Sequence, residues 1–169
     1  MNEQTFWALV ESAKAECDRT SRDEATWQPA VLQRKLEALP PSEIMAFAEI
    51  FETLHARAYR RELWAAAYVI EGGCSDDGFM DFRSGLIGLG REAYYDAIRD
   101  PRTLIRQPAR GVDFSQETMR YAAGLAYEAV TGEELPDLRV DPPEPIGERW
   151  DDATKYATYP ELARKFGAR

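Results

Sequence analysis

The residues from Glu71 to Phe79, EGGCSDDGF, bring together a dense group of chemically active side chains. Nine positions contain one thiol, one hydroxyl and three carboxylates, together with three glycines. A thiol can act as a nucleophile, and carboxylates can bind hard metal ions. The same residue types also end one helix and begin the next. The segment therefore predicts either a functional site or a corner between two helices.

A catalytic nucleophile in this segment would be Cys74, which precedes a predicted helix start. A helix N-terminus favours the thiolate, whereas nearby carboxylates oppose it. The only histidine, His55, would have to act as the base. On a straight helix, at about 1.5 Å per residue, His55 would lie about 22 Å from Ile70, so the chain would have to fold back. The alternative for Cys74 is a small residue buried at a tight corner.

Metal binding is the second chemistry, because Asp76, Asp77 and Asp81 with Glu71 can supply oxygen ligands for magnesium or calcium. The spacing lacks the alternating acids and the final glutamate of an EF-hand loop. One histidine and two distant cysteines also argue against zinc. The alternative is that the aspartates cap a helix and complement its dipole. We therefore expect no bound metal and no cofactor, and these aspartates are the metal candidates that remain.

A polar network is the third possibility. Arg60, Arg61 and Glu62 interrupt an apolar helix stripe, so at least one of them should face inward and need a partner. An ion pair between these arginines and the aspartates of the corner would hold the corner in place. The same arrangement can bind an anionic or polar ligand. The candidate ligand-binding residues are Asp76, Asp77, Asp81, Arg83, Arg60 and Arg61.

Helices must position all of these side chains. Apolar residues at helical spacing predict a first helix around Phe6 to Ala13 and a second from Glu24 to Leu39, with Trp27, Val31 and Leu36 on one stripe. A third runs from Ser42 to about Ile70, either bent near Arg60 or divided into two helices. Gly72 and Gly73 then end a helix, and Ser75, Asp76 or Asp77 caps the next. Further helices are predicted over residues 91–99, 115–131 and 161–166, with Tyr121 and Leu125 packed inside the protein.

The character of the chain changes after residue 135. Residues 136–160 are rich in proline and acidic side chains, with Trp150, Tyr156 and Tyr159 as aromatic residues suited to an interface or to covering an apolar groove. Only segments such as Leu138 to Val140 leave room for a strand. The predicted fold class is all-α, an irregular helical bundle with a proline-rich extended C-terminal segment. The predicted division is a helical domain, 1–135, and an extended acidic, proline-rich tail with a short terminal helix, 136–169.

The overall charge limits the partners. The chain has 169 residues, with 30 acidic and 21 basic side chains and a formal net charge of −9. Such a charge opposes binding to nucleic acid or to an anionic membrane, and it favours a partner with a basic surface. Cys17 and Cys74 are expected to be reduced thiols. We find no signal peptide and no apolar stretch that could span a bilayer, so we expect a cytoplasmic protein.

One part of the sequence resembles a known family. The run from Val69 to Ile98, VIEGGCSDDGFMDFRSGLIGLGREAYYDAI, is similar to the signature of DUF4240, a bacterial family of unknown function. The opening with Phe6 and Trp7, and the spacing to Leu36 and Phe51, fit the family as well. The resemblance covers about Met1 to Gly132. It implies a shared fold and a bacterial, cytoplasmic setting, and it implies no activity, substrate or catalytic residue.

Two functional hypotheses follow from these observations. The first is a non-enzymatic module that binds a protein partner, because the chain is acidic, has one histidine and contains an aromatic tail. The alternative is a small-molecule or metal-binding enzyme with its site at the helix corner from Gly72 to Arg83.

Overall fold

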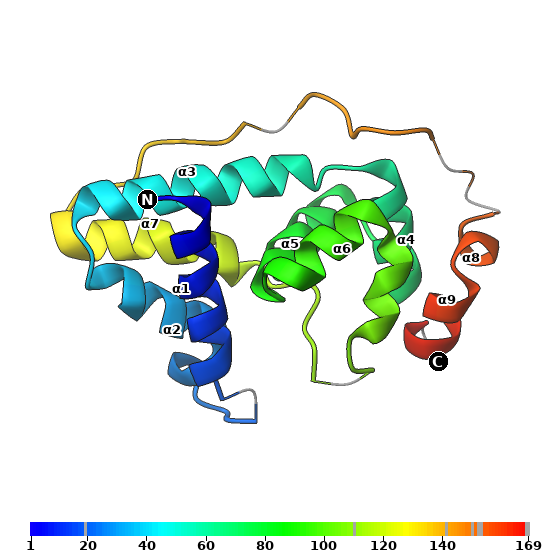
Figure 1. Ribbon diagram of the computed structural model, residues 1–169, viewed down its shortest axis with the longest axis horizontal. Helices are drawn as coiled ribbons and strands as arrows, with labels where there is room; N and C mark the ends of the chain where they lie inside the picture. The colour runs from blue at the N-terminus through cyan, green and yellow to red at the C-terminus, as the bar shows by residue number, and fades with distance from the viewer. Residues whose placement is uncertain (19, 110, 141, 150, 152–153, 168–169) are drawn as a thin grey trace.

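The computed structural model describes residues 1–18, 20–109, 111–140, 142–149, 151 and 154–167 (Figure 1). Within these ranges the fold is all-α, as predicted, and no strand forms. The elements, with η for a 3₁₀ helix, are α1 (Glu3–Glu16), η1 (Glu24–Thr26), α2 (Gln28–Glu37), α3 (Pro41–Arg57), α4 (Arg61–Glu71), α5 (Asp76–Gly88), α6 (Arg91–Arg99), η2 (Pro101–Arg106), α7 (Thr118–Thr131), α8 (Lys155–Thr158) and α9 (Pro160–Phe166). None of the helices in the described ranges has the length and apolar character needed to cross a bilayer.

Two groups of helices lie side by side along the molecule (Figure 1). At one end, α2 packs along α1 and α7, and α3 packs along α7. At the other end, α4 packs against α8 and α9, and α6 packs against η2. Because α5 contacts α1, α3 and α7, one continuous hydrophobic core joins the two groups. This core places the loop before α7 against α5.

The apolar stripe from Ile44 to Ile70 is divided between two helices, which is the second of the two predicted alternatives. α3 ends at Arg57, and Arg60 already has extended backbone angles. The backbone N–H of Arg61 donates to the carbonyl of Ile146 at 2.8 Å, and the N–H of Ile146 donates to the carbonyl of Tyr59 at 2.9 Å. The break between α3 and α4 is therefore held by hydrogen bonds to Ile146, which lies far away in the sequence.

The corner between α4 and α5 is built from the residue types that the sequence predicts for it. Gly72 ends α4 in the left-handed conformation, with φ of 71°. Ser75 caps α5, because its hydroxyl accepts a hydrogen bond from the N–H of Gly78 at 3.1 Å. Asp76 and Asp77 lie in the first turn of α5, where negative charge complements the helix dipole.

The predicted apolar stripe of the second helix is wrong for Trp27, whose side chain is 42% exposed. The physical reason is that Trp27 is the N-cap of α2 and has extended backbone angles. The helical period therefore does not govern its direction.

The prediction that Tyr121 and Leu125 pack inside the protein is also wrong, since each is 50% exposed. Both lie on α7, whose buried face is formed largely by Ala122, Ala123 and Ala126. Small side chains allow neighbouring helices to approach closely. The two larger residues are left half-exposed.

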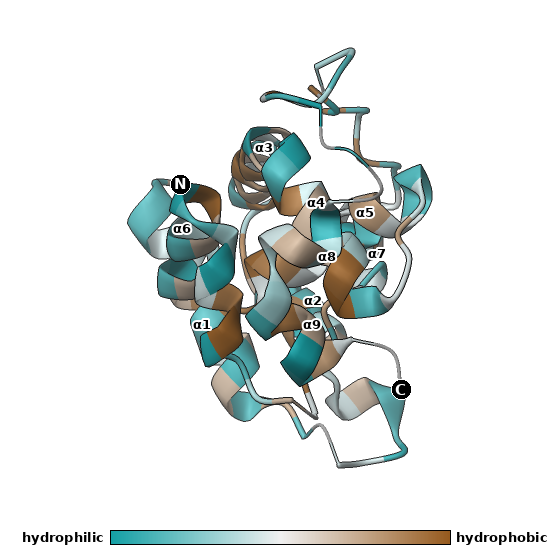
Figure 2. Ribbon diagram, turned by 90° about the vertical axis from the view of Figure 1, so that its right-hand side faces the viewer, coloured by the Kyte–Doolittle hydropathy of each residue, from teal (hydrophilic) through white to brown (hydrophobic). Residues whose placement is uncertain are grey.

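After α7 the chain runs extended past α3 to the opposite end of the molecule (Figure 1). Figure 2 shows this segment as largely hydrophilic. Leu138 to Val140 form no strand, and the described residues contain a single parallel β-bridge, between Arg60 and Ile146. The division of the chain near residue 135 remains a prediction.

The end of the chain returns to the core. α9 confirms the predicted terminal helix from Glu161 to Phe166, and Leu162 on it is buried. Tyr159 is buried as well, and its hydroxyl donates to the carbonyl of Glu62 at 3.0 Å. Tyr156 is exposed instead, and Trp150 lies outside the described residues. The C-terminal segment therefore covers α4 through Tyr159.

Candidate functional site

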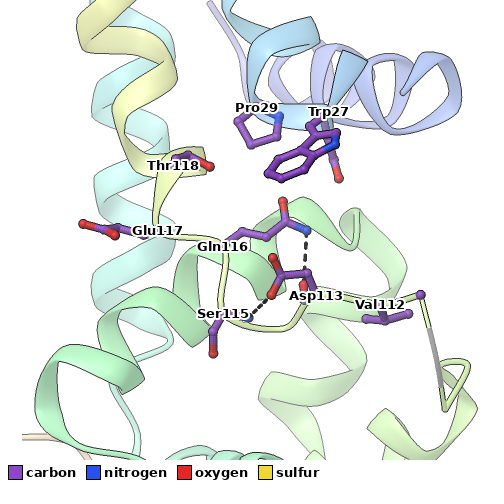
Figure 3. Close-up of a pocket in the computed structure, with 10 residues that line it drawn as sticks. Trp27, Pro29, Val112, Asp113, Ser115, Gln116, Glu117 and Thr118 are labelled. Atoms are coloured by element: carbon purple, nitrogen blue, oxygen red, sulfur yellow. Dashed lines mark hydrogen bonds between the residues drawn. The ribbon is translucent and has the colours of Figure 1, made fainter. Parts of the chain in front are cut away.

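A cavity of about 450 Å³ lies between the start of α2 and the loop that precedes α7 (Figure 3). Trp27, Gln28 and Pro29 form one wall, and residues 111–113 and 115–118 form the other. Its volume lies in the range of small-ligand sites in proteins. None of the ten residues that line it belongs to the predicted corner from Gly72 to Arg83.

A glycine on α5 holds the loop of this cavity in place. A Cβ atom at Gly85 would overlap the backbone carbonyl of Phe114, so only glycine allows the loop to lie this close to the helix. Phe114 is buried, and its ring stacks on Phe82 with centroids 5.7 Å apart. Gly85 thus supports the cavity indirectly, because it allows the cavity loop to pack closely against α5.

The polar groups of the cavity are fixed by local hydrogen bonds. The amide nitrogen of Gln116 donates to the backbone carbonyl of Asp113 at 3.1 Å, which directs the amide oxygen towards Trp27 (Figure 3). That oxygen is buried and accepts no hydrogen bond from any described residue. One carboxylate oxygen of Asp113 accepts from the N–H of Ser115 at 3.0 Å.

Trp27 contributes mainly the face of its ring. Its indole N–H donates to the backbone carbonyl of Ser21 at 3.1 Å, so the polar edge is already bonded. A second cavity of about 260 Å³ shares Trp27, Pro29 and Thr118 and extends to Leu125. The two cavities together form an apolar groove between α2 and α7, which we call the α2–α7 groove.

Carboxylates gather next to this groove. Burial, then the negative charges of Glu117 and Asp77, raise the pKa of Asp81. Partial burial of its carboxyl and the charge of Asp113 raise the pKa of Glu71. These effects mean that like charges lie near one another. The fold therefore brings the acids of the corner together with the acids of the cavity loop.

Cys74 and His55 lie in different surroundings. Burial, followed by the charges of Glu71 and Asp81, raises the pKa of the Cys74 thiol to about 12. His55 is fully buried, its ring stacks on Phe51, and its Nε2 lies 3.0 Å from the carbonyl oxygen of Met80. Within the described residues no hydrogen bond joins Cys74 to His55.

The arginines also lie apart from the aspartates of the corner. Arg83 is buried, with its guanidinium 4.5 Å from the ring centroid of Tyr59. Arg61 pairs with Glu144 at 3.0 Å, and Arg60 bridges to the tail through its backbone. Among the described residues no ion pair joins Asp76, Asp77 or Asp81 to Arg60, Arg61 or Arg83. None of the predicted inward-facing residues Arg60, Arg61 and Glu62 is buried, whereas Arg83 is. The predicted ion pair with the aspartates does not form between these described residues.

The described part of the chain contains no group of three histidine, cysteine or acidic side chains placed to hold a metal ion. Asp76 and Asp77 are exposed at the start of α5, and Asp81 lies one turn further along the helix. The structure therefore places these candidates on a surface rather than around a common point.

Sequence reasoning missed Trp27, Asp113 and Gln116 as members of one site. The signal that could have indicated a close loop was the pair Gly85 and Gly88, spaced three residues apart on one face of a helix. Which loop would approach that face depends on tertiary packing.

Comparison with known proteins identifies a family but no individual similar protein. Neither a curated protein nor a solved structure shows significant similarity to this chain. The family DUF4240, described as a protein of unknown function, matches residues 1–129. The match includes the corner and the cavity loop, and it ends before the segment that covers α4. The chain therefore belongs to the DUF4240 family.

Proposed function

We propose that this protein is a cytoplasmic, non-enzymatic module that binds a basic segment of a protein partner in the α2–α7 groove. The observation that carries the proposal is a pair of half-exposed apolar side chains in the groove, Trp27 and Leu125, together with Glu117 of the same groove, which lies among carboxylates that repel one another. Large exposed apolar groups that lie together are typical of interaction surfaces. Carboxylates that raise each other's pKa favour a cationic neighbour.

The charge of the whole chain supports the same partner. A net charge of −9 attracts basic surfaces and repels nucleic acid. Cys17 and Cys74 are both free thiols, as expected for a protein of a reducing compartment. The high pKa of Cys74 argues against a nucleophile at the corner.

The proposal can be tested with three matched baits. Wild type, Leu125→Glu and Val130→Glu are used to isolate proteins from the native host at physiological salt. Val130 is also exposed on α7 but lines neither cavity of the groove, so it controls for the added charge. We expect one partner that wild type and Val130→Glu retain and Leu125→Glu loses.

The partner must then be purified and the binding reproduced with the two pure proteins. The proposal stands if a basic segment of the partner is needed for this binding and Leu125→Glu weakens it at least about tenfold, a change of about 1.4 kcal/mol. A partner that binds Leu125→Glu as tightly as wild type would overturn the groove as the binding surface.

A further inference from the structure

We infer that α9 acts as a clamp on the loop of residues 111–117 and thereby controls binding of the partner in the α2–α7 groove. Most residues of this loop line the larger cavity of the groove. The inference rests on the proposed function and specifies how the same site is regulated. It depends on contacts that the loop makes outside the cavity, with a helix far away in the sequence.

Phe114 is the residue of the loop that α9 reaches. Its ring is 5% exposed and does not line the cavity, whereas its neighbours Asp113 and Ser115 do. The ring of Phe166, the last residue of α9, meets it edge-on, with centroids 5.4 Å apart and an interplanar angle of 85°. This geometry is favourable for an aromatic pair. α9 therefore contacts the cavity wall between two residues that line it.

A second contact joins α9 to η2, the element that precedes the loop. The Nζ atom of Lys165 donates to the backbone carbonyl of Ile105 at 2.7 Å. Gly111, in the left-handed conformation with φ of 74°, lies between Ile105 and Phe114. The same helix thus holds the chain on both sides of this turn. Contacts at both sides reduce the conformational freedom of the chain between them.

The start of α9 is held on the core by other residues. Leu162 is 1% exposed, and the hydroxyl of buried Tyr159, which precedes the helix, donates to the carbonyl of Glu62 on α4 at 3.0 Å. These contacts do not involve Phe166. Removing the ring of Phe166 should therefore break the contact with the loop while the start of the helix stays in place.

The loop also has contacts that do not depend on α9. The ring of Phe114 stacks on Phe82 of α5, with centroids 5.7 Å apart, and a side-chain hydrogen bond joins Ser115 to Glu71 of α4. Because these contacts remain, loss of the clamp should loosen the loop without unfolding it.

A looser loop changes the wall of the groove, so α9 and the partner are coupled through the packed rings of Phe166 and Phe114. A partner that binds the ordered loop must first restore this order in a chain that lacks the clamp, which lowers its affinity. The family match covers the loop and the groove but not α9, so the control lies outside the matched residues.

The first test compares wild type with Phe166→Ala and Arg164→Ala. Hydrogen exchange is followed by NMR at the amides of Ser115 and Met119, which donate to Asp113 and to Gln116. We expect Phe166→Ala to accelerate both at least about fivefold, because the aromatic pair is lost. Arg164 is exposed on the same helix, so Arg164→Ala should leave both rates unchanged. The amide of Ala163, which donates to the carbonyl of Tyr159, shows whether α9 itself stays folded.

The second test measures binding with the partner that the matched baits isolate. Purified wild type, Phe166→Ala, Arg164→Ala and Leu125→Glu are titrated with this purified protein. We expect Phe166→Ala to bind at least about threefold more weakly than wild type, and Arg164→Ala to bind equally well.

The outcomes separate the clamp from the groove. Unchanged exchange of Ser115 and Met119 in Phe166→Ala would overturn the clamp. Faster exchange with unchanged affinity for the partner would overturn its control of the groove, while the groove stands if Leu125→Glu still weakens binding. If Leu125→Glu keeps full affinity, the proposed function falls and the control of binding falls with it. The exchange rates then decide by themselves whether α9 holds the loop.

Discussion

Arg83 donates a hydrogen bond of 3.0 Å from Nη1 to the backbone carbonyl of His55, so a buried arginine of α5 is tied to the last turn of α3. Its guanidinium also lies over the rings of Tyr59 and Phe79, 4.5 Å and 5.5 Å from their centroids. Arg83 therefore contacts the core, and these contacts predict that it stabilises the fold.

Replacing this arginine should destabilise the protein. We expect Arg83→Met to lower the free energy of unfolding by about 3 kcal/mol, because a hydrogen bond to a charged group and its contacts with two rings are lost. Urea unfolding followed by circular dichroism measures the change. Arg99→Ala is the matched control, since its side chain is 76% exposed and its ion pair lies on the surface. A loss below about 1 kcal/mol for Arg83→Met would contradict this role.

Gly85 and Gly124 should respond in opposite ways to alanine. Gly85→Ala forces a Cβ atom into the carbonyl of Phe114, so we expect a loss of about 2–3 kcal/mol of stability and displacement of the cavity loop. Gly124→Ala, within α7, meets no atom within 4 Å and should stabilise the protein by about 0.5–1 kcal/mol. Thermal unfolding of both variants checks the contrast. The explanation fails if the two changes have the same sign.

The thiol of Cys74 should react slowly in the folded protein. Burial and two nearby carboxylates raise its pKa from 9.0 to about 12, so the thiolate fraction near pH 7 falls by about a thousandfold. A thiol reagent applied to Cys17→Ser, which leaves only Cys74, measures this rate before and after unfolding in urea. Rapid labelling of the folded protein at neutral pH would contradict this prediction and make Cys74 a candidate nucleophile again.

Removing the charge of Asp81, one of the carboxylates near the groove, should stabilise the free protein at neutral pH. Since the pKa of Asp81 is raised in the folded state, the folded chain holds this proton more tightly than the unfolded chain, and stability falls as pH rises above the unfolded value. We expect Asp81→Asn to gain up to about 1 kcal/mol at pH 7 and nothing well below the unfolded pKa. Urea unfolding at the two pH values tests this. An equal effect at both would point to a cause other than charge.

The C-terminal segment should contribute to stability although the family match ends at residue 129. Tyr159 is 4% exposed and donates to the carbonyl of Glu62, whereas Tyr156 is 44% exposed. We expect Tyr159→Ala to cost about 3 kcal/mol and Tyr156→Ala less than about 1 kcal/mol. Chemical unfolding of the two variants measures both losses of stability. Similar losses would mean that the segment is not part of the cooperative core.

The sequence by itself determined the local structure. The cap at Ser75, the helix ends at Gly72 and Gly132, and the helix over residues 91–99 all agree with the structure. These features depend on interactions between residues a few positions apart, so residue type and spacing are sufficient to predict them. The all-α class follows from the same patterns.

Tertiary structure decided which residues meet. The break before Arg61 bonds to Ile146, and the cavity joins Trp27 to Gln116, nearly ninety positions later in the chain. Periodicity assigns an apolar residue to a face, but it cannot say whether another helix covers that face, as the half-exposed Tyr121 and Leu125 show. Contacts of this kind depend on how the helices pack, because the free energy of burial is shared among elements distant in sequence. The corner was therefore predictable as a corner, whereas the groove and its pocket arise only when α2, α5 and α7 come together.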